Sequence, residues 1–201
     1  YHAVRVLGAS AYGAQQIIMS DVARAMVEER GQEDWDSEFQ RFPRLFEGHE
    51  SIPGLTYPTT TFSDSMTVYL GKRRVDIKHI GRAHTAGDAV IHVPDQNVMF
   101  TGDIVEDHSA CYCGDGYFGD WGQTLDNIKA YDVDAIAPGR GGALIGKDAV
   151  GKCLLGDRAQ RVRGDAIYAH ITLYFHGKKL GGQHQPGFAI PVRQAPIRGK
   201  R

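Results

Sequence analysis

Three short polar motifs, separated by apolar segments, constrain the fold of this chain more than any other feature. HTAGD occupies residues 84–88, Gly102 and Asp103 follow, and PGRG occupies residues 138–141. The apolar segments between them predict strands, which would place His84 in a loop and Asp103 at the C-terminal end of a strand. Rigid sheets commonly present catalytic groups from such positions. The motifs therefore indicate a catalytic or binding edge on a sheet.

Local patterns in the first part of the chain predict alternating helices and strands. Ser20 is a typical helix N-cap and Gly31 a typical stop, which predicts a helix of about ten residues between them. A second helix is expected to end near Phe42, and a third to begin at Asp120, where Gln123 would complete a capping box. The predicted strands cover residues 16–19, 66–70, 75–77, 89–93, 98–101 and 135–137. This alternation favours a mixed α/β sandwich.

The order and spacing of the three motifs resemble the metallo-β-lactamase superfamily. In that family the HTxGD run supplies a zinc-binding His, the GD pair supplies a carboxylate, and a PGHG run supplies a final His. Arg140 stands in place of this final His. The resemblance covers about residues 1–150 and implies an αββα sandwich of the α/β (α+β) class that lacks its first strands. We assign residues 1–155 to this domain.

The first residues resemble another motif of the same family, HxHxDH, entered midway. His2 matches the second His of the motif, whereas Val4 and Arg5 stand where the motif has Asp and His. The chain begins without Met, which favours a fragment or a trimmed product. The first His of the motif is then expected upstream of Tyr1.

The resemblance implies that one of the family's two metal sites survives. His2, His84 and Asp103 remain as metal ligands, whereas Arg5 and Arg140 occupy positions of the second site. Guanidinium groups stay charged and offer no lone pair to a metal. We therefore expect at most one zinc ion, with Asp103, Arg140 and Arg5 as catalytic residues and the arginines as electrostatic clamps. Asp103 is expected either as a ligand or as the ion-pair partner of Arg140.

The expected activity is zinc-dependent hydrolysis of an ester, thioester or lactone bond in a small-molecule substrate, whose anionic group the arginines would hold. One alternative is a mononuclear iron oxygenase that resembles the persulfide dioxygenases of the same superfamily, because two His and one Asp are a related ligand set. Another alternative is a non-catalytic member of the fold with an anion-binding pocket. The sequence leaves the substrate and the oligomeric state open.

Two further groups border the expected site. Asp88 is expected to brace its own loop by accepting backbone hydrogen bonds rather than to bind metal. His108, Cys111, Cys113 and Asp115 follow Asp103 closely, and we expect them to pack or to form a lid loop. Zinc binding by this run is the alternative, because imidazole and thiolate groups are zinc ligands.

Charge is distributed unevenly along the chain. Residues 1–151 contain 13 Lys and Arg against 22 Asp and Glu, while residues 152–201 contain 10 against 2. Residues 156–201 lack a sustained apolar period, which predicts a basic, poorly ordered tail rather than a nucleic-acid-binding arm. No apolar stretch approaches the roughly 20 residues of a bilayer span, so no membrane partner is expected. Three cysteines argue against a disulfide framework and favour a reducing, cytoplasmic location.

Overall fold

The computed structural model describes residues 1–2, 6–51, 53–109 and 112–154. All of them belong to the first of the two units into which the chain divides, Tyr1–Ala166. The predicted tail at residues 156–201 lies outside the described residues, as do Val4 and Arg5. None of the helices in the described ranges combines the length and the apolar character that crossing a membrane requires.

A six-stranded sheet carries most of the motifs. Its strands follow the order β3-β4-β5-β6-β7-β8, with bounds Ser65–Leu70, Arg73–Lys78, Val90–Val93, Val98–Glu106, Ala135–Arg140 and Leu144–Ile145. Neighbouring strands are antiparallel except β6 and β7, which are parallel and are joined through helix α3 (Phe118–Lys129). The five strands predicted between residues 66 and 137 are therefore confirmed. However, β6 continues beyond residue 101, so Asp103 lies inside the strand rather than at its end.

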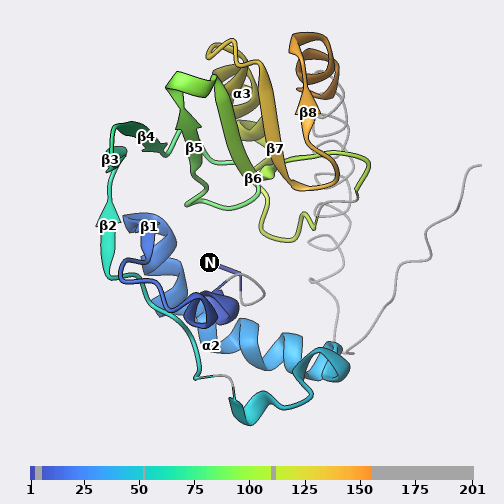
Figure 1. Ribbon diagram of the computed structural model, residues 1–201. Helices are drawn as coiled ribbons and strands as arrows, with labels where there is room; N and C mark the ends of the chain where they lie inside the picture. Colours follow the sequence, from blue (N-terminus) through green and yellow to red (C-terminus); the bar gives the residue numbers. More distant parts are fainter. Residues whose placement is uncertain (3–5, 52, 110–111, 155–201) are drawn as a thin grey trace, which may run out of the picture. The chain divides into compact units, whose positions relative to one another are not determined.

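Helix α3 covers one face of this sheet (Figure 1). Alternate strand residues reach that face and form a buried core with α3: Val90, Met99, Ile136 and Leu144 from the strands, and Trp121, Leu125 and Ile128 from the helix. The indole N–H of Trp121 donates a hydrogen bond to the carbonyl of Ile104 at 3.0 Å. This bond fixes α3 to the strand that carries Asp103 and satisfies the one polar atom of a fully buried ring.

The start of α3 differs from the prediction. The helix begins at Phe118, because the carbonyl of Tyr117 accepts from the N–H groups of Asp120 and Trp121, and no side chain caps it. The predicted capping box is wrong, since Gln123 donates instead to Asn127 on the next turn.

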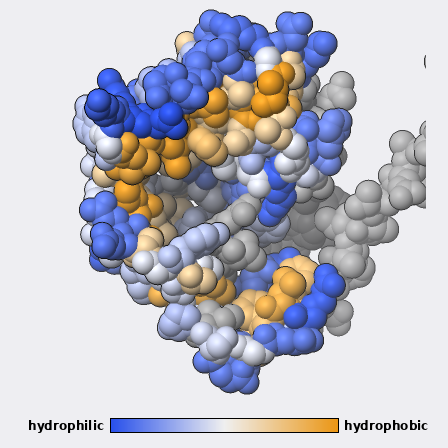
Figure 2. Space-filling view, viewed as in Figure 1, coloured by the Kyte–Doolittle hydropathy of each residue, from blue (hydrophilic) through white to orange (hydrophobic). Residues whose placement is uncertain are grey.

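The opposite face of the sheet is also apolar. Met66, Ile77, Ile91 and Phe100 are neighbours in register across β3 to β6. Ile91 and Phe100 keep 38% and 46% of their surface exposed, and Figure 2 shows hydrophobic residues across the strands on the viewed face. A sheet that is apolar on both faces is typical of the inner layers of an α/β protein. The predicted mixed α/β class is confirmed.

Helix α2 (Asp21–Arg41) follows strand β1 (Ile18–Ser20), which pairs in parallel with β2 (Thr60–Phe62). The Ser20 hydroxyl accepts a hydrogen bond from the N–H of Ala23 at 3.1 Å, which confirms the predicted cap. Gly31 does not end the helix, which continues to Arg41. Gly31 is buried, and a Cβ there would lie 2.8 Å from Leu55 Cδ1. The glycine permits close packing, so the two helices predicted here are one.

Short 3-10 helices occupy several of the remaining segments: η1 (Leu7–Tyr12), η2 (Pro43–Phe46), η3 (His49–Ser51) and η4 (Pro94–Gln96).

Candidate active site

The loop at residues 84–88 is held by its own hydrogen bonds. The Asp88 carboxylate accepts from the backbone N–H of Thr85 at 2.9 Å and from the Thr85 hydroxyl at 2.5 Å. His79 Nδ1 lies 2.6 Å from the Asp88 carbonyl oxygen. The expectation that Asp88 braces its loop is thus confirmed, and the loop presents His84 in a fixed position.

The same loop is docked on the N-terminus of α2. The hydroxyl of Ser20 donates to the carbonyl of Gly87 at 2.8 Å. A Cβ at residue 87 would lie 2.5 Å from the backbone nitrogen of Ala23, so only glycine fits there without displacing backbone. One serine therefore caps the helix and anchors the loop that carries His84.

His84 is buried and keeps one nitrogen available. It is 4% exposed, its ring packs edge-on against Trp121, and its ring centroid lies 4.8 Å from that of His2. Within the described residues its Nε2 is buried without a hydrogen-bond partner. Burial lowers the pKa of His84 to about 4; the charge of Asp103 opposes this shift, and His2 and Arg140 reinforce it. At neutral pH the imidazole is therefore neutral, as a metal ligand must be.

His2 is oriented by a carboxylate that the sequence did not single out for this role. Its Nε2 lies 2.9 Å from Asp115 Oδ2, while the Arg30 guanidinium donates to Asp115 Oδ1 at 3.0 Å. Burial alone would raise the pKa of Asp115, but hydrogen bonds from Tyr1, His2 and Arg30 outweigh it and lower the pKa. With Nε2 donating to this carboxylate, the other ring nitrogen is left to act as an acceptor. Metal-binding histidines are commonly held this way.

Asp103 is placed by irregular backbone on β6. The pairing of β6 with β7 shifts register between Phe100 and Gly102 and again before Glu106, and Gly102 has a left-handed φ of 53°. Such bulges redirect side chains and recur beside active sites. A Cβ at Gly139 would clash with Asp103 Oδ1, so the glycine of the PGRG motif leaves the room that this carboxylate occupies.

Arg140 pairs with a residue that the sequence analysis did not consider. Its Nη1 donates to Glu106 Oε1 at 3.0 Å, across the β6–β7 register that pairs these two residues. The Glu106 side chain has no exposed surface, whereas 39% of the Arg140 side chain is exposed. The buried Glu106 carboxylate therefore holds one side of the guanidinium, and the choice between ligand and Arg140 partner for Asp103 stays a prediction.

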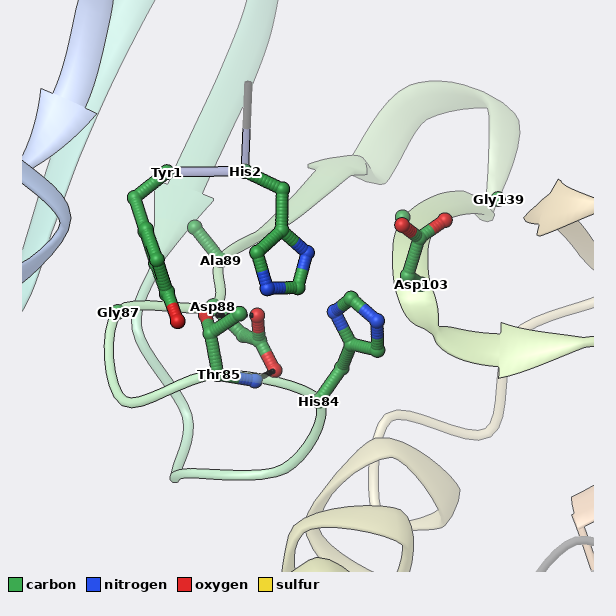
Figure 3. Close-up of a pocket in the computed structure, with 10 residues that line it drawn as sticks. Tyr1, His2, His84, Thr85, Gly87, Asp88, Ala89, Asp103 and Gly139 are labelled. Atoms are coloured by element: carbon green, nitrogen blue, oxygen red, sulfur yellow. Dashed lines mark hydrogen bonds between the residues drawn. The ribbon is translucent and has the colours of Figure 1, made fainter. Parts of the chain in front are cut away.

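A cavity of about 360 Å³ brings the predicted ligands together. His2, His84 and Asp103 all line it, together with Asp88 and Gly139. Figure 3 shows His84 between His2 and Asp103, at the end of the loop that Thr85 and Asp88 close. Arg140 lines a second pocket of about 490 Å³, which shares His2, His84 and Asp103 with the first. The predicted role of Arg5 stays a prediction, because Arg5 lies outside the described residues.

These donors fit part of a site for one metal ion. The free Nε2 of His84, the carboxylate-oriented ring of His2 and the cradled Asp103 carboxylate are a chemically suitable set. Yet residues 1–2, 6–51, 53–109 and 112–154 contain no group of three or more His, Cys, Asp or Glu side chains arranged to bind a metal ion. A full ligand shell is thus not formed by the described residues alone.

The cysteine-containing run does not add a described metal site. His108 projects into solvent with a side chain that is 93% exposed, and Cys113 packs against the core under α3. Cys111 lies outside the described residues. From this run, Asp115 is the residue that contacts a candidate ligand, His2, and only its proximity to Asp103 in the sequence could have indicated it.

Comparisons with known proteins identify the family of this chain. The family model of the metallo-beta-lactamase superfamily matches residues 9–140. The metallo-beta-lactamase type 2 of Bacteroides fragilis is 32% identical over 93 residues, which make up 44% of this chain and 37% of that protein. The chain therefore spans well under half of this relative's length in the match.

Solved structures show the same fold at low identity. A metallo-beta-lactamase from Pontibacter korlensis has a TM-score of 0.53 at 18% identity, covering 72% of this chain and 58% of that one. Metallo-beta-lactamase IND-7 has a TM-score of 0.52 at 18% identity, covering 72% and 59%. The chain spans about three-fifths of each.

Proposed function

Because the chain belongs to the metallo-beta-lactamase superfamily, we propose that it is a metal-dependent hydrolase with at most one zinc ion, held by His2, His84 and Asp103. The observation that carries the proposal is the buried, unpartnered Nε2 of His84, among the described residues, in a cavity that His2 and Asp103 also line. An orphaned buried nitrogen is costly unless a ligand satisfies it. The fold alone does not choose the substrate.

The proposed reaction is hydrolysis of an ester, thioester or lactone bond. A bound zinc ion would supply Lewis acidity, polarising a carbonyl and making a water molecule more acidic. The chain's own residues hold the geometry: Asp115 orients His2, Trp121 and the Asp88-braced loop orient His84, and Gly139 leaves room for Asp103. Preorganised groups of this kind lower the free energy needed to reach the transition state.

Arg140 is the proposed clamp for an anionic group of the substrate. Its guanidinium is fixed by Glu106 on one side and reaches the pocket that adjoins the metal ligands on the other. A charge that is already oriented loses little entropy when it binds a carboxylate. We propose the same electrostatic role for Arg5.

The odd cysteine count supports a reducing, cytoplasmic location as part of this proposal.

The test is the metal content of the purified chain together with hydrolysis of a 4-nitrophenyl ester and of a β-lactam, the latter because the matched relatives are named as β-lactamases. We expect no more than one equivalent of zinc, loss of that zinc in His84→Gln, and loss of hydrolysis with a chelator. His49→Gln is the matched control, since His49 is exposed and lines neither pocket.

Each other outcome overturns a stated part. Two tightly bound zinc ions that both disappear in His84→Gln would contradict the single-site proposal. Iron in place of zinc would favour the oxygenase alternative, and a chain without metal or hydrolysis would favour the anion-binding alternative.

A further inference from the structure

The C-terminal half of α2 forms part of the lining of the second pocket. The sequence had predicted two separate helices in place of α2. Arg30, Asp34, Glu38 and Arg41 line it from α2, and Arg44 lines it from η2. Because the helix continues through Gly31, these side chains reach the rim of the cavity that holds His2, His84 and Asp103. A pocket that shares three residues with a candidate catalytic cavity is placed to hold the rest of a substrate.

Most charges in this pocket are already balanced. Arg30 donates to Asp115 at 3.0 Å and lies 3.9 Å from Asp34. Arg41 pairs with Glu38 at 3.2 Å. Burial raises the pKa of Asp34, so its carboxylate is less readily charged than an exposed one. Apart from Asp103, each acidic side chain that lines the pocket therefore lies within ion-pair distance of an arginine.

Arg44 is different. Among the described residues it forms no ion pair with a carboxylate, and its side chain lines the pocket from an exposed position. Arg140, which Glu106 already holds, also lines this pocket. A guanidinium without an internal partner is a ready donor of two parallel hydrogen bonds to an oxyanion.

The pocket also has exposed apolar side chains in its lining. Phe42, Leu45 and Tyr112 line the pocket with 39%, 60% and 49% of their surfaces exposed. The Tyr112 ring also packs edge-on against His2, with centroids 5.6 Å apart, so the apolar wall extends to the candidate ligands. Large apolar side chains exposed in a concavity mark a binding surface more often than a structural one.

We propose that this pocket selects the substrate: an acyl compound that carries an oxyanion group, bound by Arg44 in addition to Arg140, and an apolar chain or ring, bound against Phe42, Leu45 and Tyr112. The inference rests on the proposed hydrolase function for the reaction itself, but the binding of the ligand stands on the pocket alone. Arg44 acts as a specificity-determining residue, and the scissile carbonyl lies toward the cavity of His84.

The first experiment compares two esters of equal acyl length with the full chain. Mono-(4-nitrophenyl) glutarate carries a carboxylate, and 4-nitrophenyl pentanoate does not. We expect a higher kcat/KM for the glutarate ester, and we expect Arg44→Ala to reduce this preference by about tenfold, as loss of one charge-assisted contact implies. Arg44→Lys should restore part of the preference. Arg24→Ala is the matched control, since Arg24 lies on α2 but pairs with Glu28 and lines neither pocket.

The second experiment separates the pocket from the reaction. Calorimetry with 5-phenylpentanoate and 5-phenylpentan-1-ol, neither of which can be hydrolysed, measures binding alone. We expect tighter binding of the carboxylate, loss of this difference in Arg44→Ala, and weaker binding of both compounds in Leu45→Ser. Equal affinity for the two compounds would overturn the inference. Binding as expected with no ester hydrolysis would instead overturn the proposed function and leave the pocket assignment standing.

Discussion

At the scale of single residues, Arg140 and Glu106 form a unit that explains why position 140 tolerates a side chain unable to bind metal. The two residues face each other across β6 and β7, and the Glu106 side chain has no contact with solvent. A carboxylate in that environment requires a cation close by, because its own desolvation is unfavourable. Once a guanidinium supplies that cation, the position contributes charge rather than a lone pair to the pocket.

A prediction about stability follows from this pair. Arg140→Ala should lower the free energy of unfolding by about 2 kcal/mol, less than for a fully buried pair because Arg140 is partly exposed. Arg140→Lys should recover part of the loss, since it restores the charge but not the guanidinium geometry. Urea unfolding of these variants, of Glu106→Gln and of the double variant forms a cycle. A coupling energy near zero would show that the pair does not stabilise the fold.

The sequence could indicate the candidate ligands but not the residues that orient them. His2, His84 and Asp103 line one cavity, as the motifs led us to expect. Asp115, which orients His2, and Glu106, which holds Arg140, are single carboxylates without a motif. Their roles depend on contacts between distant parts of the chain, 113 positions apart for His2 and Asp115. Local patterns carry no information about such contacts.

At the scale of elements, the decisive feature is the contact between the loop at residues 84–88 and the N-terminus of α2. Ser20 binds both, and Gly87 lies against the backbone of Ala23. The sequence indicated the cap and the loop separately. It could not show that the cap and the loop are in contact. The sequence pattern also predicted a helix end at Gly31, because glycine is favoured both at helix ends and at close contacts, and the pattern alone does not distinguish the two.

Gly87→Ala tests this contact. The added Cβ would press on the backbone nitrogen and Cα of Ala23, which cannot move without shifting the helix. We expect a loss of about 2 kcal/mol in the free energy of unfolding, as for other overpacked sites, and weaker zinc binding because the loop carries His84. Gly119→Ala is the control: it lies in α3 with no atom near the added methyl, and its stability should not fall. Equal stability of both variants would show that the loop does not rest on α2.

At the scale of the whole molecule, the sheet carries polar side chains among its buried and partly buried residues. Asp76 of β4 and His92 of β5 are partners in register, and Asp76 is buried. Burial alone would raise the pKa of Asp76, but hydrogen bonds from Arg74 and Thr67 outweigh it and hold the pKa below its ordinary value. The alternation of the sequence predicted these strands correctly. It did not predict an ion-paired carboxylate among their buried residues.

His92 gives this arrangement a measurable pH dependence. Burial lowers its pKa below the ordinary 6.5; the charge of Asp76 opposes the shift, and that of Lys78 and Arg74 reinforces it. The Asn97 side chain and the Tyr131 ring also face it. As the pH falls below that ordinary value, His92 binds a proton in the unfolded chain but stays neutral in the folded one. The free energy of unfolding therefore decreases with falling pH in this window. Below the ordinary pKa of Asp76 near 3.8, the protonation of that carboxyl removes a further contribution.

The last prediction isolates the His92 contribution. His92→Gln keeps a side chain of similar size but cannot titrate, so the free energy of unfolding from urea titrations should fall less between about pH 7 and pH 5 than in the unaltered chain. Buried His84 also titrates in this direction, but it is present in both proteins and cancels in the difference. His49→Gln, at an exposed position away from the sheet, controls for the loss of any histidine. If the free energy of unfolding fell with pH at the same slope in His92→Gln and in the unaltered chain, the pKa of His92 would be the same in the folded and unfolded states. That result would contradict the burial of His92 in the structure.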